Sequence, residues 1–133
     1  MQSFALPGID ADRVQAALDR VWEQYAGPQG AQLEVAMLPS EDHTAVHGEQ
    51  MQDPSVTDVM AFAYEDEDLY GEILVNAELC LSEGPKHGHS PAREALLYLI
   101  HGALHLLGFR DDVESARKEM RAAEARILGG MDA

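Results

Sequence analysis

Two histidines four residues apart, followed by a glycine and an acid, are the residues of this chain best suited to metal chemistry. Residues 101–112 read HGALHLLGFRDD. In a helix, His101 and His105 lie one turn apart on the same face, where two imidazoles can bind one metal ion. A bare pair of this kind is also compatible with two hydrogen-bonded core histidines.

The residues after the histidine pair favour the metal interpretation. Gly108 can adopt a positive φ, end the helix and turn the chain back. Asp111, six residues after His105, can then supply a third ligand. We therefore predict a metal site composed of His101, His105 and Asp111. Its neighbour Asp112 is a second candidate ligand, but we favour a role as the cap of the next helix.

The residue after the first histidine argues against one class of metalloenzyme. Peptidases with an HExxH motif use the glutamate of that motif as the general base. This chain has Gly102 at that position. A peptidase of this design would keep its metal and lose its base, so we expect Gly102 to permit close approach of another backbone or of substrate.

The elements that must position these residues follow from hydrophobic spacing and from turn residues. Apolar residues at helical spacing predict a helix over 10–25, with Asp10 or Asp12 as its cap. Further predicted helices cover 40–52, 92–107 and 113–128, and a short helix follows the third strand. Predicted strands cover 33–38, 57–64 and 71–76, and residues 84–91 are predicted to be a loop. Short strands between helices indicate an α+β or α/β sandwich.

Composition limits the partners and the compartment. The 133 residues fit a single domain over 1–133, and 24 acidic against 9 basic residues give a net charge of −15. Such a charge repels phosphate backbones, so any contact with nucleic acid must be local, and we expect no DNA partner. No apolar stretch predicts a membrane span or a secretory signal. The single cysteine, Cys80, fits a reducing cytoplasm, but the favoured interpretation is a small buried apolar residue.

Three segments in order resemble the YbeY endoribonuclease family. HGALHLLGFRDD is similar to the family signature HGxLHLxGYDH. SVTDVMAF at 55–62 resembles PTDVLSF, and GEILVNAE at 71–78 resembles GDIxICxD. The helix that contains EMRAAEARIL is similar to the C-terminal helix of the family, so the resemblance extends over about residues 33–128.

The resemblance implies a fold and a function. It implies an α+β fold, with a small mixed sheet of about four strands flanked by helices and a zincin-like metal helix. It also implies a cytoplasmic, zinc-dependent hydrolase that cleaves single-stranded RNA. Its expected role is maturation of the 3′ end of small-subunit ribosomal RNA and ribosome quality control, with that RNA and ribosomal proteins as partners.

The sequence departs from the family pattern at the metal ligands. The third histidine of the signature is Asp111 here. An anionic ligand lowers the net charge of a zinc site to about +1, from about +2 with three histidines, and makes the ion a weaker Lewis acid. Two histidines and one carboxylate also suit Ni²⁺, Fe²⁺ or Mn²⁺.

The resemblance also places an arginine before the TDV strand, and this chain has Met51 there, with His47 at an asparagine position. We expect Arg110 to supply the missing positive charge as a catalytic residue. Glu72, at the acid of the GDI segment, is the second catalytic candidate, although a surface charge at a strand end is equally compatible. His47 could bind phosphate, but an exposed helix position without a role is favoured.

The remaining polar candidates receive mostly structural interpretations. His87 and His89 could suggest a second metal site, but a solvent-exposed loop is favoured because no acid lies nearby in the sequence. His43 is expected at the surface. Asp58 is expected to accept backbone N–H bonds, close to the site.

Two other functions remain open at this point. One is a metallopeptidase or another small metallohydrolase. The other is a metal-stabilised ribosome-assembly factor that binds without cleaving.

Overall fold

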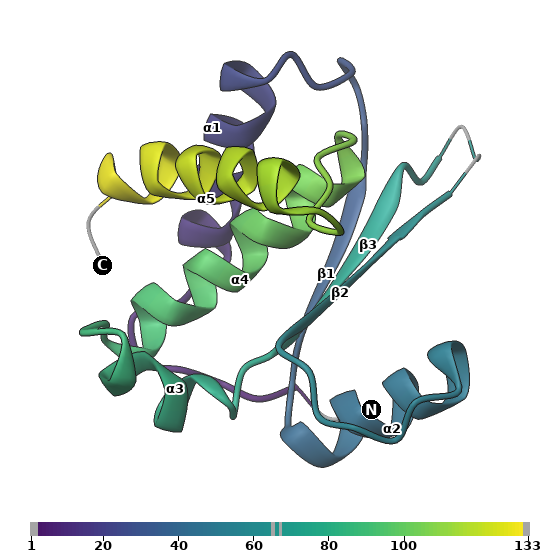
Figure 1. Cartoon of the computed structure of the whole chain (residues 1–133), viewed down its shortest axis with the longest axis vertical. Helices are drawn as coiled ribbons and strands as arrows, with labels where there is room; N and C mark the ends of the chain where they lie inside the picture. Colours follow the sequence, from purple (N-terminus) through teal and green to yellow (C-terminus); the bar gives the residue numbers. More distant parts are fainter. Residues whose placement is uncertain (1–2, 65, 67, 132–133) are drawn as a thin grey trace.

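A three-stranded sheet lies between one helix on its first face and a group of helices on its second face (Figure 1). The computed structural model describes residues 3–64, 66 and 68–131. The helices and strands follow the chain in this order: α1 (Ala11–Gln24), β1 (Leu33–Leu38), α2 (Ser40–Met51), β2 (Val59–Ala63), β3 (Gly71–Asn76), α3 (Cys80–Lys86), α4 (Pro91–Leu106) and α5 (Glu114–Gly129).

The sheet is mixed and has β3 at its centre. β1 runs parallel to β3, with Leu33 opposite Gly71, and β2 runs antiparallel to β3, with Val59 opposite Val75. The α+β class is therefore confirmed. The described residues form three strands rather than the four expected. In the segment before α1, Phe4 N donates a backbone hydrogen bond to Met37 O of β1 at 2.8 Å. None of the described residues of this segment belongs to a strand.

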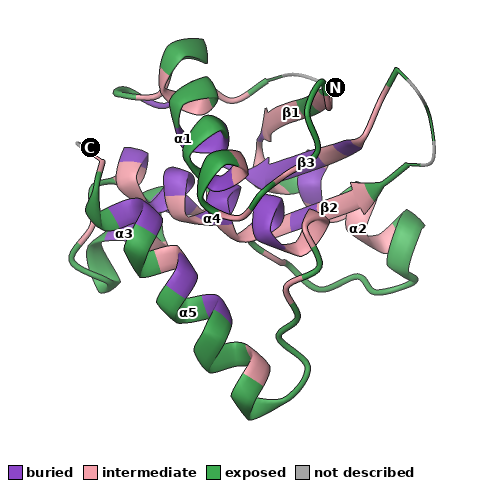
Figure 2. Ribbon diagram, turned by 90° about the horizontal axis from the view of Figure 1, so that it is seen from above, coloured by how far each residue is buried: buried purple, intermediate pink, exposed green. Residues whose placement is uncertain are grey.

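Alternation along β3 separates two hydrophobic clusters. Ile73 and Val75 face the cluster formed with α1, α4 and α5, whereas Leu74 packs with Leu38 and Met60 on the α2 side. In Figure 2, buried residues are concentrated along α4 and β3. α4 is thus the central helix of the core, and its position relative to the sheet determines where its histidines lie.

Local capping explains where the helices begin. The Asp10 carboxylate accepts a hydrogen bond from Arg13 N at 2.8 Å, which confirms Asp10 as the cap of α1. Ser90 caps α4 in the same way, and Pro91 occupies the first helical turn, where a missing N–H costs nothing. Within the predicted loop 84–91, residues 84–86 instead belong to α3.

Two single-residue expectations have different outcomes. Cys80 is fully buried, and burial raises the pKa of its thiol to about 12, which confirms it as a core residue. The surface position expected for His43 is wrong: its side chain is fully buried and its Nε2 lies 2.8 Å from Leu74 O. Burial lowers the pKa of His43, so the imidazole is neutral and ties α2 to the sheet.

Candidate metal centre

The histidine pair lies in the last two turns of α4, and the chain turns back immediately afterwards. Gly108 has φ +97°, a conformation that favours glycine. Its N–H donates to His105 O at 3.0 Å, and Phe109 N–H donates to Leu104 O at 3.0 Å, so the helix end is capped. The predicted turn at Gly108 is therefore confirmed, and it brings Asp111 back toward the helix.

Three side-chain atoms converge at this turn. The Nε2 atoms of His101 and His105 lie 3.0 Å apart, and Asp111 Oδ2 lies 3.4 Å from the first and 3.3 Å from the second. Ligand atoms around a tetrahedral zinc ion are about 3.3 Å apart, given bonds of about 2.0–2.2 Å. The separations therefore fit a small divalent cation, and the three residues form a group whose ligand atoms lie close enough together to hold one ion.

A carboxylate on the next helix orients the first histidine. Glu124 of α5 accepts a hydrogen bond from His101 Nδ1 at 2.5 Å. Donation from Nδ1 leaves the lone pair of a neutral imidazole on Nε2, the atom that faces His105 and Asp111. Burial opposes protonation of His101, but the hydrogen bond and charge of Glu124 outweigh burial and raise its pKa. A site that attracts a proton in this way also attracts a metal cation.

Glu124 is a functional residue that the sequence analysis missed. It lies 23 positions after His101, on a helix chosen only for its apolar spacing. In the structure Glu124 is half-buried between Met120 and Ile127 on the core side of α5, and no motif in the sequence marks it.

A cleft opens beside His101. It has a volume of about 570 Å³ and is bounded by α4, α5, the end of α3 and residues 56–58. Asp58 lies on its rim and accepts a hydrogen bond from Val59 N at 2.8 Å, as expected for a carboxylate that orders the start of β2. The metal-ligand group is thus continuous with a space large enough for a ligand.

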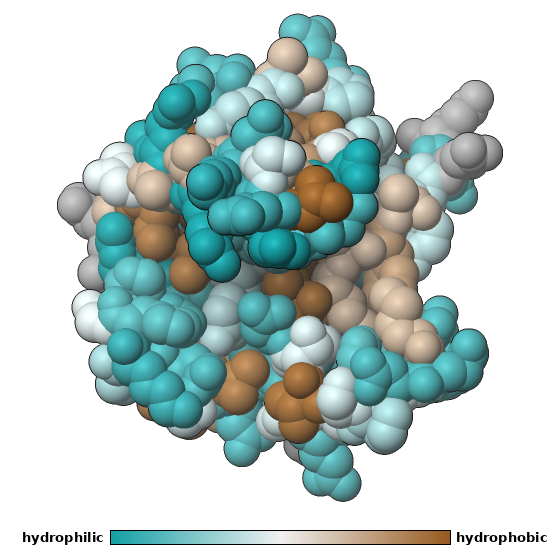
Figure 3. Space-filling model, viewed as in Figure 1, coloured by the Kyte–Doolittle hydropathy of each residue, from teal (hydrophilic) through white to brown (hydrophobic). Residues whose placement is uncertain are grey.

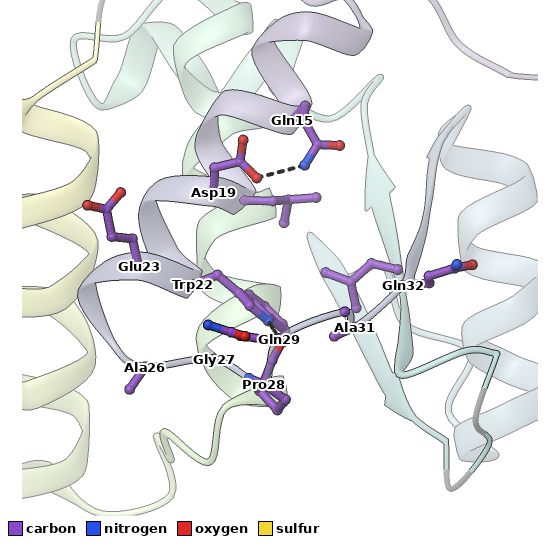
Figure 4. Close-up of a pocket in the computed structure, with 13 residues that line it drawn as sticks. Gln15, Asp19, Trp22, Glu23, Ala26, Gly27, Pro28, Gln29, Ala31 and Gln32 are labelled. Atoms are coloured by element: carbon purple, nitrogen blue, oxygen red, sulfur yellow. Dashed lines mark hydrogen bonds between the residues drawn. The ribbon is translucent and has the colours of Figure 1, made fainter.

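A larger cavity lies away from this group. It occupies about 810 Å³ beneath the end of α1 and the following loop, and Figure 4 shows Trp22 over Gly27–Gln29. Trp22 Nε1 donates to Pro28 O at 2.9 Å, and Gln15 donates to Asp19 at 2.8 Å. None of the three candidate metal ligands lines it, so we locate the chemistry in the smaller cleft.

Neither predicted catalytic residue, Arg110 or Glu72, lines the cleft beside His101. Arg110 follows the turn, but its guanidinium binds Asp112, with Nε 3.1 Å from Oδ1. Its side chain is 67% exposed and does not line the cleft. The capping role expected for Asp112 is wrong, because α5 begins after Val113 without a side-chain cap.

Glu72 lies on the opposite face of the sheet from α4. It is opposite Phe62 in the register and shares its face with Leu74, whereas Ile73 meets Gly102 of α4. Its carboxylate accepts a hydrogen bond from the Tyr64 hydroxyl at 2.9 Å. The structure therefore does not bring Glu72 to the metal-ligand group.

Gly102 explains how closely α4 approaches the sheet. A Cβ at this position would lie 2.8 Å from Ile73 Cγ2 and 3.2 Å from Val59 Cγ2. The close approach expected here exists, and its partners are side chains of the sheet. A glutamate at this position would face the sheet and not the three ligand atoms.

Comparisons with known proteins agree with this geometry. The sequence model of the family described as Endoribonuclease YbeY matches residues 8–132. The chain belongs to the YbeY family. The Endoribonuclease YbeY of Pelotomaculum thermopropionicum is 32% identical over 115 residues, which cover 77% of this chain and 75% of the relative. That of Campylobacter jejuni serotype O:23/36 is 34% identical, with 78% and 77% covered.

A solved structure has the same fold. The solution structure of TM1509 from Thermotoga maritima has a TM-score of 0.64 to this chain at 20% identity, and the match covers 96% of this chain and 87% of that protein. At this identity the likeness concerns the fold alone.

Two residues that depart from the YbeY pattern, Met51 and His47, lie at the C-terminal part of α2. Met51 is 48% exposed at the end of α2, and His47 Nδ1 lies 2.9 Å from Ser55 O, which ties α2 to the segment before β2. Neither residue lines the cleft beside His101.

His87 and His89 lie in a loop as predicted, with His87 exposed and His89 half-buried, but the expectation that no acid lies near them is wrong. Their Nδ1 atoms lie 2.7 and 2.8 Å from the two oxygens of Glu94, a residue with no exposed surface. Glu94 lies beyond the loop, in the first turn of α4, so the sequence of the loop itself gives no sign of this acid.

Proposed function

We propose that this chain is a metal-dependent endoribonuclease that cleaves single-stranded RNA in the cytoplasm. The observation that supports this proposal most strongly is the convergence of His101, His105 and Asp111 beside a cleft in a member of the YbeY family. The relatives named above are described as endoribonucleases. Zinc is the proposed cation, and the carboxylate ligand also suits iron, nickel or manganese.

In the proposed reaction, the metal ion and the residues of the chain have different roles. A divalent cation at this site supplies positive charge that polarises a phosphodiester and activates water. His101, His105 and Asp111 would hold it, and Glu124 fixes the ring orientation of His101. The acidic surface repels RNA elsewhere, so binding must occur where the cation and nearby donors offset that charge.

We further propose that the physiological substrate is the 3′ region of precursor small-subunit ribosomal RNA, with ribosomal proteins as partners. This extension rests on family membership. Cleavage of that precursor, compared with an unrelated single strand of equal length, tests it. Equal rates on both RNAs would contradict this substrate assignment and leave the nuclease proposal intact.

The test of the nuclease proposal is His105→Ala in the full chain. Removing one of three ligands should abolish stoichiometric metal in elemental analysis and should abolish cleavage of single-stranded RNA. His47→Ala is the matched control, because it removes an imidazole outside the ligand group. Cleavage by His105→Ala at the wild-type rate would contradict the proposal. If the wild-type protein instead bound metal and RNA without cleaving the RNA, an assembly factor would be favoured.

A further inference from the structure

The cleft beside His101 has features that the metal ligands do not explain. It extends along α4 from His101 to Glu94, two helical turns or about 10 Å. Leu97 and Tyr98 of α4 line it between these residues, and Val56, from the segment before β2, also lines it. Figure 3 shows this face of the molecule hollowed beneath α5, with apolar side chains in the hollow.

One basic side chain stands among the acids of this cleft. Four acids line it, namely Asp58, Glu83, Glu94 and Glu124, and Arg121 is the one arginine or lysine among its lining residues. No hydrogen bond or ion pair to another described residue holds the Arg121 guanidinium, whereas Lys118, one turn earlier on α5, lies 3.8 Å from Glu114. Arg121 is therefore available to an anion that enters the cleft.

A fixed imidazole stands at the far end of the cleft. Glu94 is fully buried, and its two oxygens accept hydrogen bonds from His87 and His89. His87 lines the cleft and is 53% exposed, whereas His89 is 22% exposed and does not line it. With Nδ1 hydrogen-bonded to Glu94, Nε2 is the ring nitrogen of His87 that remains for a hydrogen bond to a ligand.

We propose that this cleft is a nucleotide-binding subsite beside the metal centre, in which Arg121 binds a phosphate and His87 forms a hydrogen bond with a ribose 2′-hydroxyl. The inference rests on the proposed nuclease function and adds how the strand is held and how RNA is distinguished from DNA. Arginine pairs with phosphate oxygens through two N–H groups, and the 2′-hydroxyl is the group that DNA lacks. Glu94 is the positioning residue, since it acts only through His87.

The first experiment measures the phosphate contact. The full, metal-loaded chain is titrated against a fluorescent single-stranded RNA at several salt concentrations, within a time in which a denaturing gel shows the RNA intact. Arg121→Gln should weaken binding about tenfold at low salt and reduce the slope of log affinity against log salt by about 0.7. Lys118→Gln removes the same charge from the same helix outside the cleft, so it should leave the slope unchanged.

The second experiment measures the hydroxyl contact. His87→Ala and His89→Ala each remove one hydrogen bond from Glu94, so both should lower thermal stability. Only His87→Ala should reduce the ratio of RNA affinity to affinity for DNA of the same sequence, by about 2- to 10-fold. The ratio is insensitive to a fraction of unfolded protein, because that fraction lowers both affinities equally.

The outcomes separate this inference from the nuclease proposal. If the wild type binds and cleaves RNA while Arg121→Gln behaves as Lys118→Gln, or His87→Ala as His89→Ala, the corresponding half of the subsite is wrong. If metal-loaded wild type neither binds nor cleaves single-stranded RNA, the nuclease proposal fails and the subsite with it.

Discussion

The orientation of one imidazole connects two helices at the metal centre. His101 points Nε2 toward His105 and Asp111 because its Nδ1 donates to Glu124 of α5. The buried Glu94, two turns earlier on α4, makes a similar contact with Nδ1 of the exposed His87. In both cases the carboxylate holds Nδ1, and the histidine is one of the residues that line the cleft.

The role of Glu124 can be tested by a substitution that keeps its size. Glu124→Gln should weaken metal affinity about 10- to 100-fold, because an amide supports the donating imidazole less strongly than a carboxylate. Competition with a chelator of known affinity measures the change. Glu119→Gln, an exposed position on the same helix, is the control. Equal metal affinities of the two variants would exclude an orienting role for Glu124.

At the scale of elements, the site depends on how α4 ends. The positive φ at Gly108 turns the chain so that Asp111 returns to the histidine face. Gly102 allows the same helix to lie against Ile73 and Val59, so its opposite face is free for α5. Gly102 thus sets how closely α4 packs on the sheet, and Gly108 sets the direction of the chain after α4.

Alanine at two glycine positions should have opposite effects on stability. Gly108→Ala should lower the free energy of unfolding by about 1–3 kcal/mol, because a side chain is strained at that φ, and should weaken metal affinity by displacing Asp111. Gly129→Ala, in the last turn of α5 with open space around it, should raise the free energy of unfolding by about 0.5 kcal/mol. Chemical denaturation with and without metal measures both. A neutral effect at Gly108 would show that the turn does not need glycine.

At the scale of the whole molecule, charge decides where RNA can bind. A net charge of −15 opposes any phosphate backbone, so RNA binding at the proposed site depends on the positive charges of a bound cation and of Arg121. Every described helix is too short or too polar to span a bilayer.

Metal binding should stabilise the entire fold, since the ligands come from α4 and from the turn that leads into α5. Zinc at about 100 times its dissociation constant should add about 2.7 kcal/mol of stability, which is roughly 10 °C in Tm for a chain of this size. Thermal unfolding with added zinc and with a chelator measures the shift. The His105→Ala protein should show no shift, and a full shift in that variant would locate the stabilising ion elsewhere.

The sequence by itself determined the features that depend on local spacing. His101 and His105 share a face because a helix repeats every 3.6 residues, and Gly108 with Asp111 encodes the turn and the third ligand within the next six positions. The strands 33–38 and 71–76 also followed from short-range pattern.

Only the tertiary structure decided which distant residues join that turn. Glu124 meets His101 because core packing sets the place of α5 against α4, and no local signal encodes that contact. Strand pairing and alternation direct Glu72 away from α4, and burial of Glu94 recruits His87 from a loop. Contacts of this kind depend on how hydrophobic faces pack in three dimensions, whereas sequence periodicity reports only which face each element buries.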